Sequence, residues 1–312
     1  MSSTRPILVT GAYRSGTTIT GRLLAASQEV EYVQEPFNPY YFDASVCSLR
    51  FERLFEYIRP EETGPRADAL RAMCALLPRT ADALLAARTT EERGRVLAHA
   101  GRWRAARALG RRALLKDPIA FYAAPWIHAR TDAAVVVVVR HPGSFVGSLK
   151  RFGWQTAVWN LLAQPELVAR RFPDLVEEAR AWTSKDADVV SQAAMFWKLT
   201  YQTAAQYRDE HQEWIFVTHE DVCRRPLETF ERLFGALGLR WTESVRATVD
   251  QFTRAGNPES VPSDVTYAPV DGAANARRWY RLLSAEEIAR VRAMTQPVAG
   301  LFYDEASWSS PG

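Results

Sequence analysis

The stretch from Pro6 to Ser27 constrains the fold more than any other part of the chain. It begins with an apolar run, Pro6–Thr10, that is typical of a buried strand, and apolar residues recur at helical spacing from Ile19 onwards. Between strand and helix lies a loop, Gly11–Thr18, with glycines at its first and sixth positions. Because the N–H groups of such a loop and the positive end of the following helix point to one place, the stretch predicts an anion-binding site.

The loop is close to the nucleotide-triphosphate signature GxxxxGK[ST] but differs from it at one position. Gly11 and Gly16 have the right separation, and Thr18 stands where the signature has its metal-binding hydroxyl. Thr17 replaces the lysine that contacts the outer phosphates of ATP or GTP, while Arg14 supplies a cation earlier in the loop. We therefore expect an anionic ligand other than a nucleoside triphosphate.

Five strand-like runs separated by helix-forming segments predict the rest of the fold; they lie near residues 6–10, 30–33, 113–118, 133–139 and 214–218. The fourth run is continuous and β-branched, which indicates a strand buried on both faces, as in a parallel sheet. We predict a single α/β domain over 1–312, with a P-loop-like parallel β-sheet flanked by helices and a large helical insertion at about 43–112. Residues 155–211 are expected to be helical and 254–276 to form a loop. Most aromatic residues of the helical stretch are expected in the core or a pocket wall; they are Trp159, Trp182, Phe196, Trp197 and Tyr201.

Composition narrows the class of protein. A net charge of +3 and 47% hydrophobic residues fit a globular protein with a focused basic site better than one that coats nucleic acid. Cys47, Cys74 and Cys223 lie far apart and form no metal-ligand pattern, which favours a reducing cytoplasm and no metal. Ala133–Val139 is too short to span a bilayer, and a first strand from about residue 6 leaves no room for a signal peptide. The oligomeric state stays open.

Two motifs carry a family resemblance. Arg14-Ser15-Gly16-Thr17-Thr18 resembles the phosphosulfate-binding loop of sulfotransferases that use 3′-phosphoadenosine 5′-phosphosulfate (PAPS). Arg140 ends the fourth predicted strand, and Ser148 follows eight residues later on the next helix. A strand-end guanidinium and a helix hydroxyl can bind one phosphate from two sides, and this pair resembles the family's 3′-phosphate motif. The alternative is an arginine capping a strand end and an ordinary helix serine.

A third, looser match is Asn275–Trp279, where Arg277 and Arg278 resemble the basic loop that closes over the adenosine phosphate in this family. A solvated basic pair is the alternative. The resemblance covers residues 6 to about 303. Within the family, the chain most resembles bacterial, carbohydrate-modifying members without a membrane anchor. It implies that PAPS is bound by Arg14, Ser15, Gly16, Thr17, Thr18, Arg140, Ser148, Arg277 and Arg278, and that no metal is required.

The resemblance also implies a catalytic set. Arg14 would stabilise charge on the leaving phosphate oxygen, and Glu35, in a Glu-Pro segment after the second strand, would be the base. Lys116 ends the third strand and would contact the sulfuryl oxygens. His141 is the second candidate base, and ion pairing is the alternative role for both Glu35 and Lys116, the latter with Asp117.

The expected function is transfer of a sulfuryl group from PAPS to a hydroxyl of a carbohydrate, glycolipid or secondary metabolite, by in-line displacement. A P-loop small-molecule kinase and a non-catalytic nucleotide-binding protein are the alternatives. Residues 88–116 hold nine Lys or Arg residues and two glutamates. They would form either a landing surface for an acidic glycan or phospholipid headgroup or a solvated helix face.

Overall fold

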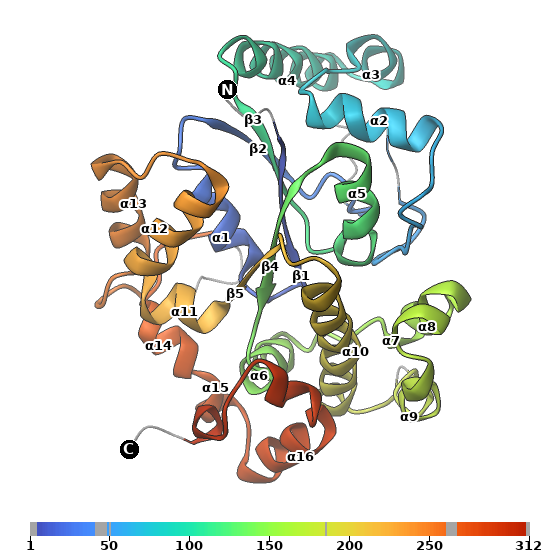
Figure 1. Ribbon diagram of the computed structural model, residues 1–312, viewed down its shortest axis with the longest axis vertical. Coiled ribbons are helices and arrows are strands. Elements are labelled where there is room, and N and C mark those ends of the chain that lie inside the picture. The colour runs from blue at the N-terminus through green and yellow to red at the C-terminus, as the bar shows by residue number, and fades with distance from the viewer. Residues whose placement is uncertain (1–4, 41–48, 50, 185, 260–266, 310–312) are drawn as a thin grey trace. The chain divides into compact units, whose positions relative to one another are not determined.

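The computed structural model describes residues 5–40, 49, 51–184, 186–259 and 267–309. Over these ranges the strands form a five-stranded sheet with the order β2-β3-β1-β4-β5 (Figure 1). The strands are β1 (Ile7–Gly11), β2 (Val30–Gln34), β3 (Arg112–Lys116), β4 (Ala134–Val139) and β5 (Ile215–Thr218). Both β1 and β2 run parallel to β3. The α/β, P-loop-like parallel sheet flanked by helices is confirmed, and each strand lies within two residues of its predicted place.

The chain divides into two compact units. The first comprises Met1–Thr10, Thr17–Val136 and Phe234–Trp241, and the second comprises Gly11–Gly16, Val137–Leu233 and Thr242–Gly312. The single domain over 1–312 stays a prediction. Within the described ranges, no helix is both long enough and apolar enough to cross a membrane.

In the first unit, the sheet register brings the strand ends together. Val9 on β1 and Gln34 on β2 are both opposite Lys116 on β3. The helices of this unit are α1 (Thr17–Leu24), α2 (Pro65–Cys74), α3 (Thr80–Ala86), α4 (Thr90–Ala108) and α5 (Ala124–Thr131), with a 3-10 turn at Phe121–Ala123. Helices α2 to α4 form the predicted insertion, of which residues 43–48 and 50 lie outside the described residues.

The longest helix of the second unit, α10 (Val189–Glu210), is buried over most of its length and packs against α6 and α16 (Figure 1). A capping box formed by Ser284 and Glu287 opens α16. Other helices are α6 (Pro142–Phe152), α7 (Val158–Leu162), α8 (Pro165–Arg171), α9 (Val176–Arg180), α11 (His219–Arg224), α12 (Pro226–Leu237, shared with the first unit), α13 (Glu243–Thr253), α14 (Gly272–Arg277), α15 (Trp279–Leu282) and α16 (Ala285–Thr295), with 3-10 turns at Pro173–Leu175, Val298–Leu301 and Glu305–Trp308.

One local prediction is wrong, and another is decided between its two alternatives. The expected loop over 254–276 contains the start of α14, because Asp271 caps that helix by accepting a hydrogen bond from the N–H of Ala274. Trp159 is 56% exposed and lies in the wall of a small cavity of about 120 Å³, with Thr156 and Gln192, and not in the core, because α7 buries Val158 and Leu161 on its other face.

Candidate active site

The loop after β1 needs glycine at both of its predicted positions. Gly16 has a φ of +96°, and a Cβ there would lie 2.4 Å from Cδ2 of His219. Gly11 has a φ of +148°, and its Cβ would lie 2.5 Å from the carbonyl oxygen of Val138. A side chain at either position would therefore meet both backbone strain and a steric clash.

Ser15, Thr17 and Thr18 differ in what they offer a ligand. Ser15 is fully buried, and both its N–H and its hydroxyl donate to the carbonyl oxygen of Ala12, so its side chain closes the loop. Thr17 is buried and is the first residue of α1, with Thr18 half-buried after it. The first N–H groups of a helix have no partner within it, so the start of α1 carries the donors that the sequence predicts.

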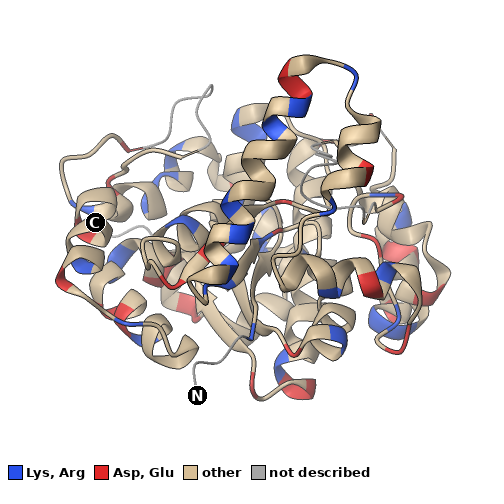
Figure 2. Ribbon diagram, turned by 90° about the horizontal axis from the view of Figure 1, so that it is seen from above, with Lys and Arg blue, Asp and Glu red and all other residues tan. Residues whose placement is uncertain are grey.

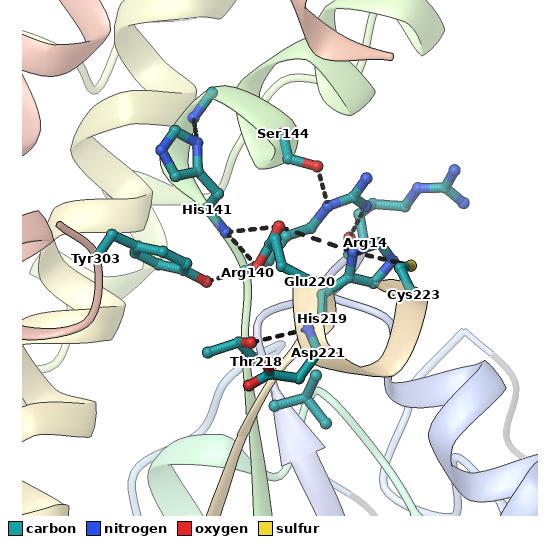
Figure 3. A network of polar contacts seen from close by, with 12 residues as sticks. Arg14, Arg140, His141, Ser144, Thr218, His219, Glu220, Asp221, Cys223 and Tyr303 are labelled. Atoms are coloured by element: carbon teal, nitrogen blue, oxygen red, sulfur yellow. Dashed lines mark hydrogen bonds and ion pairs between the residues drawn. The ribbon is translucent and has the colours of Figure 1, made fainter. Parts of the chain in front are cut away.

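Arg14 adopts a left-handed backbone conformation, with a φ of +61°, which is rare for a residue with a side chain. Its Nε donates a hydrogen bond to Oγ of Ser148 at 3.3 Å (Figure 3 shows the arginine). Its guanidinium carbon lies 4.5 Å from the ring centre of Phe152 and 5.5 Å from that of Trp154. Arg14 and Ser148, predicted separately from two motifs, are therefore in contact.

Arg140 is bonded to the same loop. Its Nη1 donates to the carbonyl oxygen of Arg14, and its Nε donates to Oγ of Ser144 at 2.8 Å (Figure 3). The carbonyl oxygen of Arg140 accepts a hydrogen bond from Nε1 of Trp197 at 2.7 Å. The guanidinium of Arg140 is thus held between the loop and the first turn of α6.

These arginines form a cluster of positive charge. Burial of part of its side chain, and the charges of Arg140 and Arg151, lower the pKa of Arg14 to about 10. Burial, and then the charge of Arg151, also lower the pKa of Arg278, which is half-buried after α14, whereas Arg277 is exposed. Because each guanidinium destabilises its neighbour's charge, a bound anion would be stabilised here.

Glu220 supplies a negative charge beside this cluster. Burial favours its neutral form, but the neighbouring His219, His141 and Arg140 overcome that effect and lower the pKa of Glu220 to about 2. Its carboxylate accepts hydrogen bonds from the N–H of His141 at 3.2 Å and from the hydroxyl of Tyr303 at 2.8 Å (Figure 3). Glu220 thus ties the end of β4 to the C-terminal part of the second unit.

His141, the second candidate base, is buried among rings. Its ring lies 4.9 Å from that of Trp279 and 4.5 Å from that of Trp308, and its Nδ1 accepts a hydrogen bond from the N–H of Gly143 at the start of α6. Burial above all lowers its pKa to about 4, so the imidazole is neutral at neutral pH. A buried side chain that accepts a hydrogen bond from the first turn of α6 fits the role of a helix cap. It fits less well the role of a base, which must contact the acceptor.

In the first unit, Glu35 follows β2 with a left-handed φ of +45°. Its Oε1 accepts a hydrogen bond from the ammonium of Lys116, and its Oε2 accepts one from Nδ2 of Asn38 at 2.8 Å. The side chain of Lys116 is 1% exposed and that of Glu35 is 19% exposed. The contact that the structure gives Lys116 is therefore with Glu35, not with Asp117.

Asp117 holds the Glu35 segment in place. It is fully buried and accepts hydrogen bonds from the N–H groups of Phe37 and Ile119, both at 2.8 Å. Burial is the largest of the effects that raise its pKa, to about 7. The chain from Glu35 to Phe37 is thus tied to the end of β3, and Glu35 N–H itself donates to the carbonyl oxygen of Lys116 at 2.8 Å.

The structure therefore places the predicted residues in two groups. Arg14, Ser148 and Arg140 are joined in the second unit, and Glu35 and Lys116 are joined in the first. Sequence reasoning did not assign site roles to Ser144 or Asn38. The spacing could have indicated both, since Ser144 lies one helical turn after Arg140 and Asn38 lies three residues after Glu35, across a turn with proline.

Comparisons with known proteins identify the family of the chain. A family model described as "Sulfotransferase family" matches residues 6–243. The chain is similar in fold to the sulfotransferase domain of the olefin synthase of Synechococcus PCC 7002, with 15% identity, a TM-score of 0.50, and coverage of 96% of this chain and 95% of that one. It is also similar to the sulfotransferase domain from the curacin biosynthetic pathway, with 14% identity, a TM-score of 0.48 and coverage of 93% and 96%.

A mouse sulfotransferase solved in complex with PAP is a more distant match, with 10% identity, a TM-score of 0.39 and coverage of 94% of this chain and 82% of that one. No curated protein matches the chain. The family match spans more than half of the sequence, from the first strand through the last one. The chain belongs to the sulfotransferase family.

Proposed function

We propose that the protein transfers the sulfuryl group of PAPS to a hydroxyl group of an acceptor. The observation that carries the proposal is the hydrogen bond from Arg14 to Ser148, together with the bond from Arg140 to the carbonyl of Arg14. It supports a site for a doubly anionic nucleotide, because two guanidiniums and a hydroxyl from separate motifs converge at one point of the second unit.

The residues present fit such a donor by their chemistry. Guanidinium groups bind phosphate oxygens through paired N–H donors. The pKa of Arg14 is lowered first by burial and then by the charges of Arg140 and Arg151, and a bound anion would offset both effects. When bound, PAPS supplies a sulfuryl group whose bond to the phosphate oxygen breaks as the acceptor oxygen attacks. Arg14 would stabilise the charge on the leaving oxygen, and Arg140, Ser148, Arg277 and Arg278 would hold the 3′-phosphate and adenosine side.

The first turn of α1 would bind the 5′ side of the donor. Thr17 and Thr18 carry N–H groups without partners inside the helix and hydroxyls that can donate. Because Gly16 has no side chain, the loop backbone can pass close to the ring of His219. Ser15 supports this loop by bonding to Ala12. Positive charge from the arginines takes the place of a metal in this proposal, so chelators are expected to leave the rate unchanged.

Glu35 is proposed as the base that accepts the proton of the acceptor hydroxyl. Each of its carboxylate oxygens has one partner, Lys116 or Asn38, and retains a further lone pair. The left-handed φ supports this role, since backbone strain of this kind concentrates at functional sites. Lys116, at 1% exposure, is proposed to act by orienting Glu35; contact with the sulfuryl oxygens is the competing role.

Thermal stabilisation by nucleotides tests the donor, and a radiolabelled sulfate-transfer assay with PAPS tests the reaction. PAP should raise the melting temperature more than 5′-AMP, and both more than Mg-ATP, since Thr17 stands where a kinase has lysine. A larger shift with Mg-ATP would favour the kinase alternative. Strong PAP binding with no transfer to any acceptor in a broad hydroxyl library would favour the non-catalytic alternative.

A further inference from the structure

An open cavity of about 860 Å³ lies in the first unit, within the range of volumes that small-molecule sites occupy, about 300–1,000 Å³. Its walls are the end of α1 with the turn after it, the strand β2, and one face of α4. Glu35, the proposed base, lines it, as do four arginines: Arg22, Arg95, Arg102 and Arg111. We call this cavity with its arginines the arginine groove.

The arginines come from elements that are far apart in sequence. Arg95 and Arg102 are exposed and two helical turns apart on α4, so they lie on the same face of that helix. In Figure 2, α4 is seen from above with basic residues along much of its length. Arg22 lies in the last turn of α1, and its guanidinium carbon lies 4.3 Å from the ring centre of Tyr32 on β2.

Glu31 orients part of this charge and balances one of the four positive charges. It is 8% exposed in its side chain and accepts a hydrogen bond from Nε of Arg102 at 2.7 Å, and Nη1 of Arg111 lies 3.8 Å from its other oxygen. Nη2 of Arg102 also contacts Nδ1 of His99 at 3.0 Å. Since a guanidinium has five N–H groups, Arg102 keeps donors for a ligand while its plane is fixed by these two partners.

The charges that line the groove are unbalanced. Four arginines face two glutamates, and one of those, Glu35, has its own partner in Lys116. A cleft with walls of one sign concentrates ligands of the other sign. Polar groups suited to hydroxyls, among them Ser27, Gln28 and Gln34, line the same walls.

We propose that the arginine groove binds the acceptor, and that the acceptor is a polyhydroxylated molecule carrying a carboxylate or phosphate. The anionic group would pair with Arg95 and Arg102, and a hydroxyl of the same molecule would reach Glu35 at the end of β2. The proposal rests on the proposed sulfuryl transfer, and it narrows the acceptor from any hydroxyl compound to an acidic one. An acidic sugar and an inositol-phosphate headgroup share this chemistry.

Binding to the full-length protein tests the proposal directly, without turnover. The first probe is an unsulfated chondroitin tetrasaccharide, compared with its carboxyl-reduced form, which keeps the hydroxyls but not the charges. The second is a vesicle containing phosphatidylinositol, compared with one of phosphatidylcholine alone. We expect one of the charged probes to bind, more weakly at high salt, and its neutral counterpart to bind at least tenfold more weakly. The charged probe that binds shows whether the acceptor is an acidic sugar or an inositol-phosphate headgroup.

Two double variants of α4 provide a matched comparison. The groove variant, Arg95→Gln with Arg102→Gln, removes two charges from the arginine groove. The control variant, Arg93→Gln with Arg104→Gln, removes two charges from exposed positions on roughly the opposite face of the same helix. The groove variant should bind the charged probe about tenfold more weakly, and the other should stay within about twofold. Equal losses in both, equal binding of the neutral probe, or binding of neither charged probe would overturn the proposal.

Stabilisation by PAP, measured on the same samples, separates this proposal from the one on which it rests. If PAP stabilises the protein and neither charged probe binds, the acidic acceptor is wrong and the donor assignment stands. If a charged probe binds through Arg95 and Arg102 and PAP does not stabilise, the groove stands and the donor assignment fails.

Discussion

Arg14 donates a hydrogen bond from Nε to Oγ of Ser148 at 3.3 Å, across 134 positions of the chain. The sequence motifs assign these residues to opposite ends of one nucleotide. The structure shows that a single arginine side chain spans from the loop after β1 to the second turn of α6. Groups for the sulfuryl side and for the 3′-phosphate side therefore lie within one side-chain length of each other.

Replacement of Arg140 should weaken binding at the 3′-phosphate end of the donor and leave binding at the 5′ end nearly unchanged. Arg140→Ala removes a guanidinium from the proposed 3′-phosphate site, so binding of PAP should weaken by about 10- to 100-fold, as expected for charge-assisted hydrogen bonds worth about 1.5–3 kcal/mol. Binding of 5′-AMP, which lacks the 3′-phosphate, should change by less than about threefold. Isothermal titration of both nucleotides measures the difference.

Arg140 also donates a hydrogen bond to the backbone of the loop, so a control is needed for a change in loop conformation that would weaken the binding of every nucleotide. Ser144→Ala provides that control, because it removes the partner of Nε and leaves the charge in place. Equal losses of PAP and 5′-AMP affinity in Arg140→Ala would contradict the 3′-phosphate assignment.

Gly16 offers a test of the loop itself. In Gly16→Ala the new Cβ would lie 2.4 Å from the ring of His219, and the φ of +96° is unfavourable for alanine. We expect a lower melting temperature and loss of PAP binding. Gly94→Ala, in α4 with open space around its Cβ, should raise the melting temperature instead, because alanine is favoured over glycine in a helix by up to about 1 kcal/mol. Unchanged PAP binding in Gly16→Ala would count against the loop as an anion site.

The strands and the loop were predictable because local sequence determines them. Continuous apolar runs give buried strands, and Gly11 and Gly16 have a spacing that only a close backbone approach explains. The contact of Arg14 with Ser148 was not predictable, since it depends on a left-handed φ at Arg14. The basic stretch 88–116 indicated three of the groove's arginines, but the groove itself was not predictable, because nothing local says which face of α4 meets β2. Trp159 shows the same limit, as its exposure follows from how α7 packs.

Glu35→Gln tests the proposed base. The amide keeps the size of the side chain but cannot take the hydroxyl proton, so kcat should fall by about 10²- to 10⁴-fold. PAP affinity should stay within about threefold, because none of the contacts of Glu35 involves the arginines of the second unit. Single-turnover rates with PAPS and an accepted hydroxyl compound measure the effect. A kcat within about threefold of the wild-type value would remove Glu35 from the mechanism.

His141 makes stability depend on pH in a predictable direction. Its pKa is lowered from 6.5 to about 4, first by burial and then by Arg224 and Arg140, with Glu220 opposing them. Between these values the unfolded chain binds a proton that the folded protein does not, so stability is fully present above about pH 6.5 and declines as pH falls towards 4. The contribution is about 3 kcal/mol.

His141→Asn isolates this effect, because asparagine also caps helices but does not titrate. The free-energy difference between wild type and variant, from urea unfolding, should be largest near pH 7.5 and smaller by about 3 kcal/mol near pH 4. A constant difference would show that His141 titrates normally. An activity limb near pH 6.5 that vanishes in the variant would instead support His141 as the base.

The last prediction separates the two roles open to Lys116. Its side chain is 1% exposed and its ammonium contacts Glu35, so we expect it to orient that carboxylate. Lys116→Met, which keeps the length of the buried stem, should then lower kcat by about tenfold or more. In the double variant with Glu35→Gln, kcat should be no lower than in Glu35→Gln alone, because the residue that Lys116 orients is already inactive. If Lys116 contacts the sulfuryl oxygens directly, the two losses should multiply, since each would remove an independent stabilisation of the transition state.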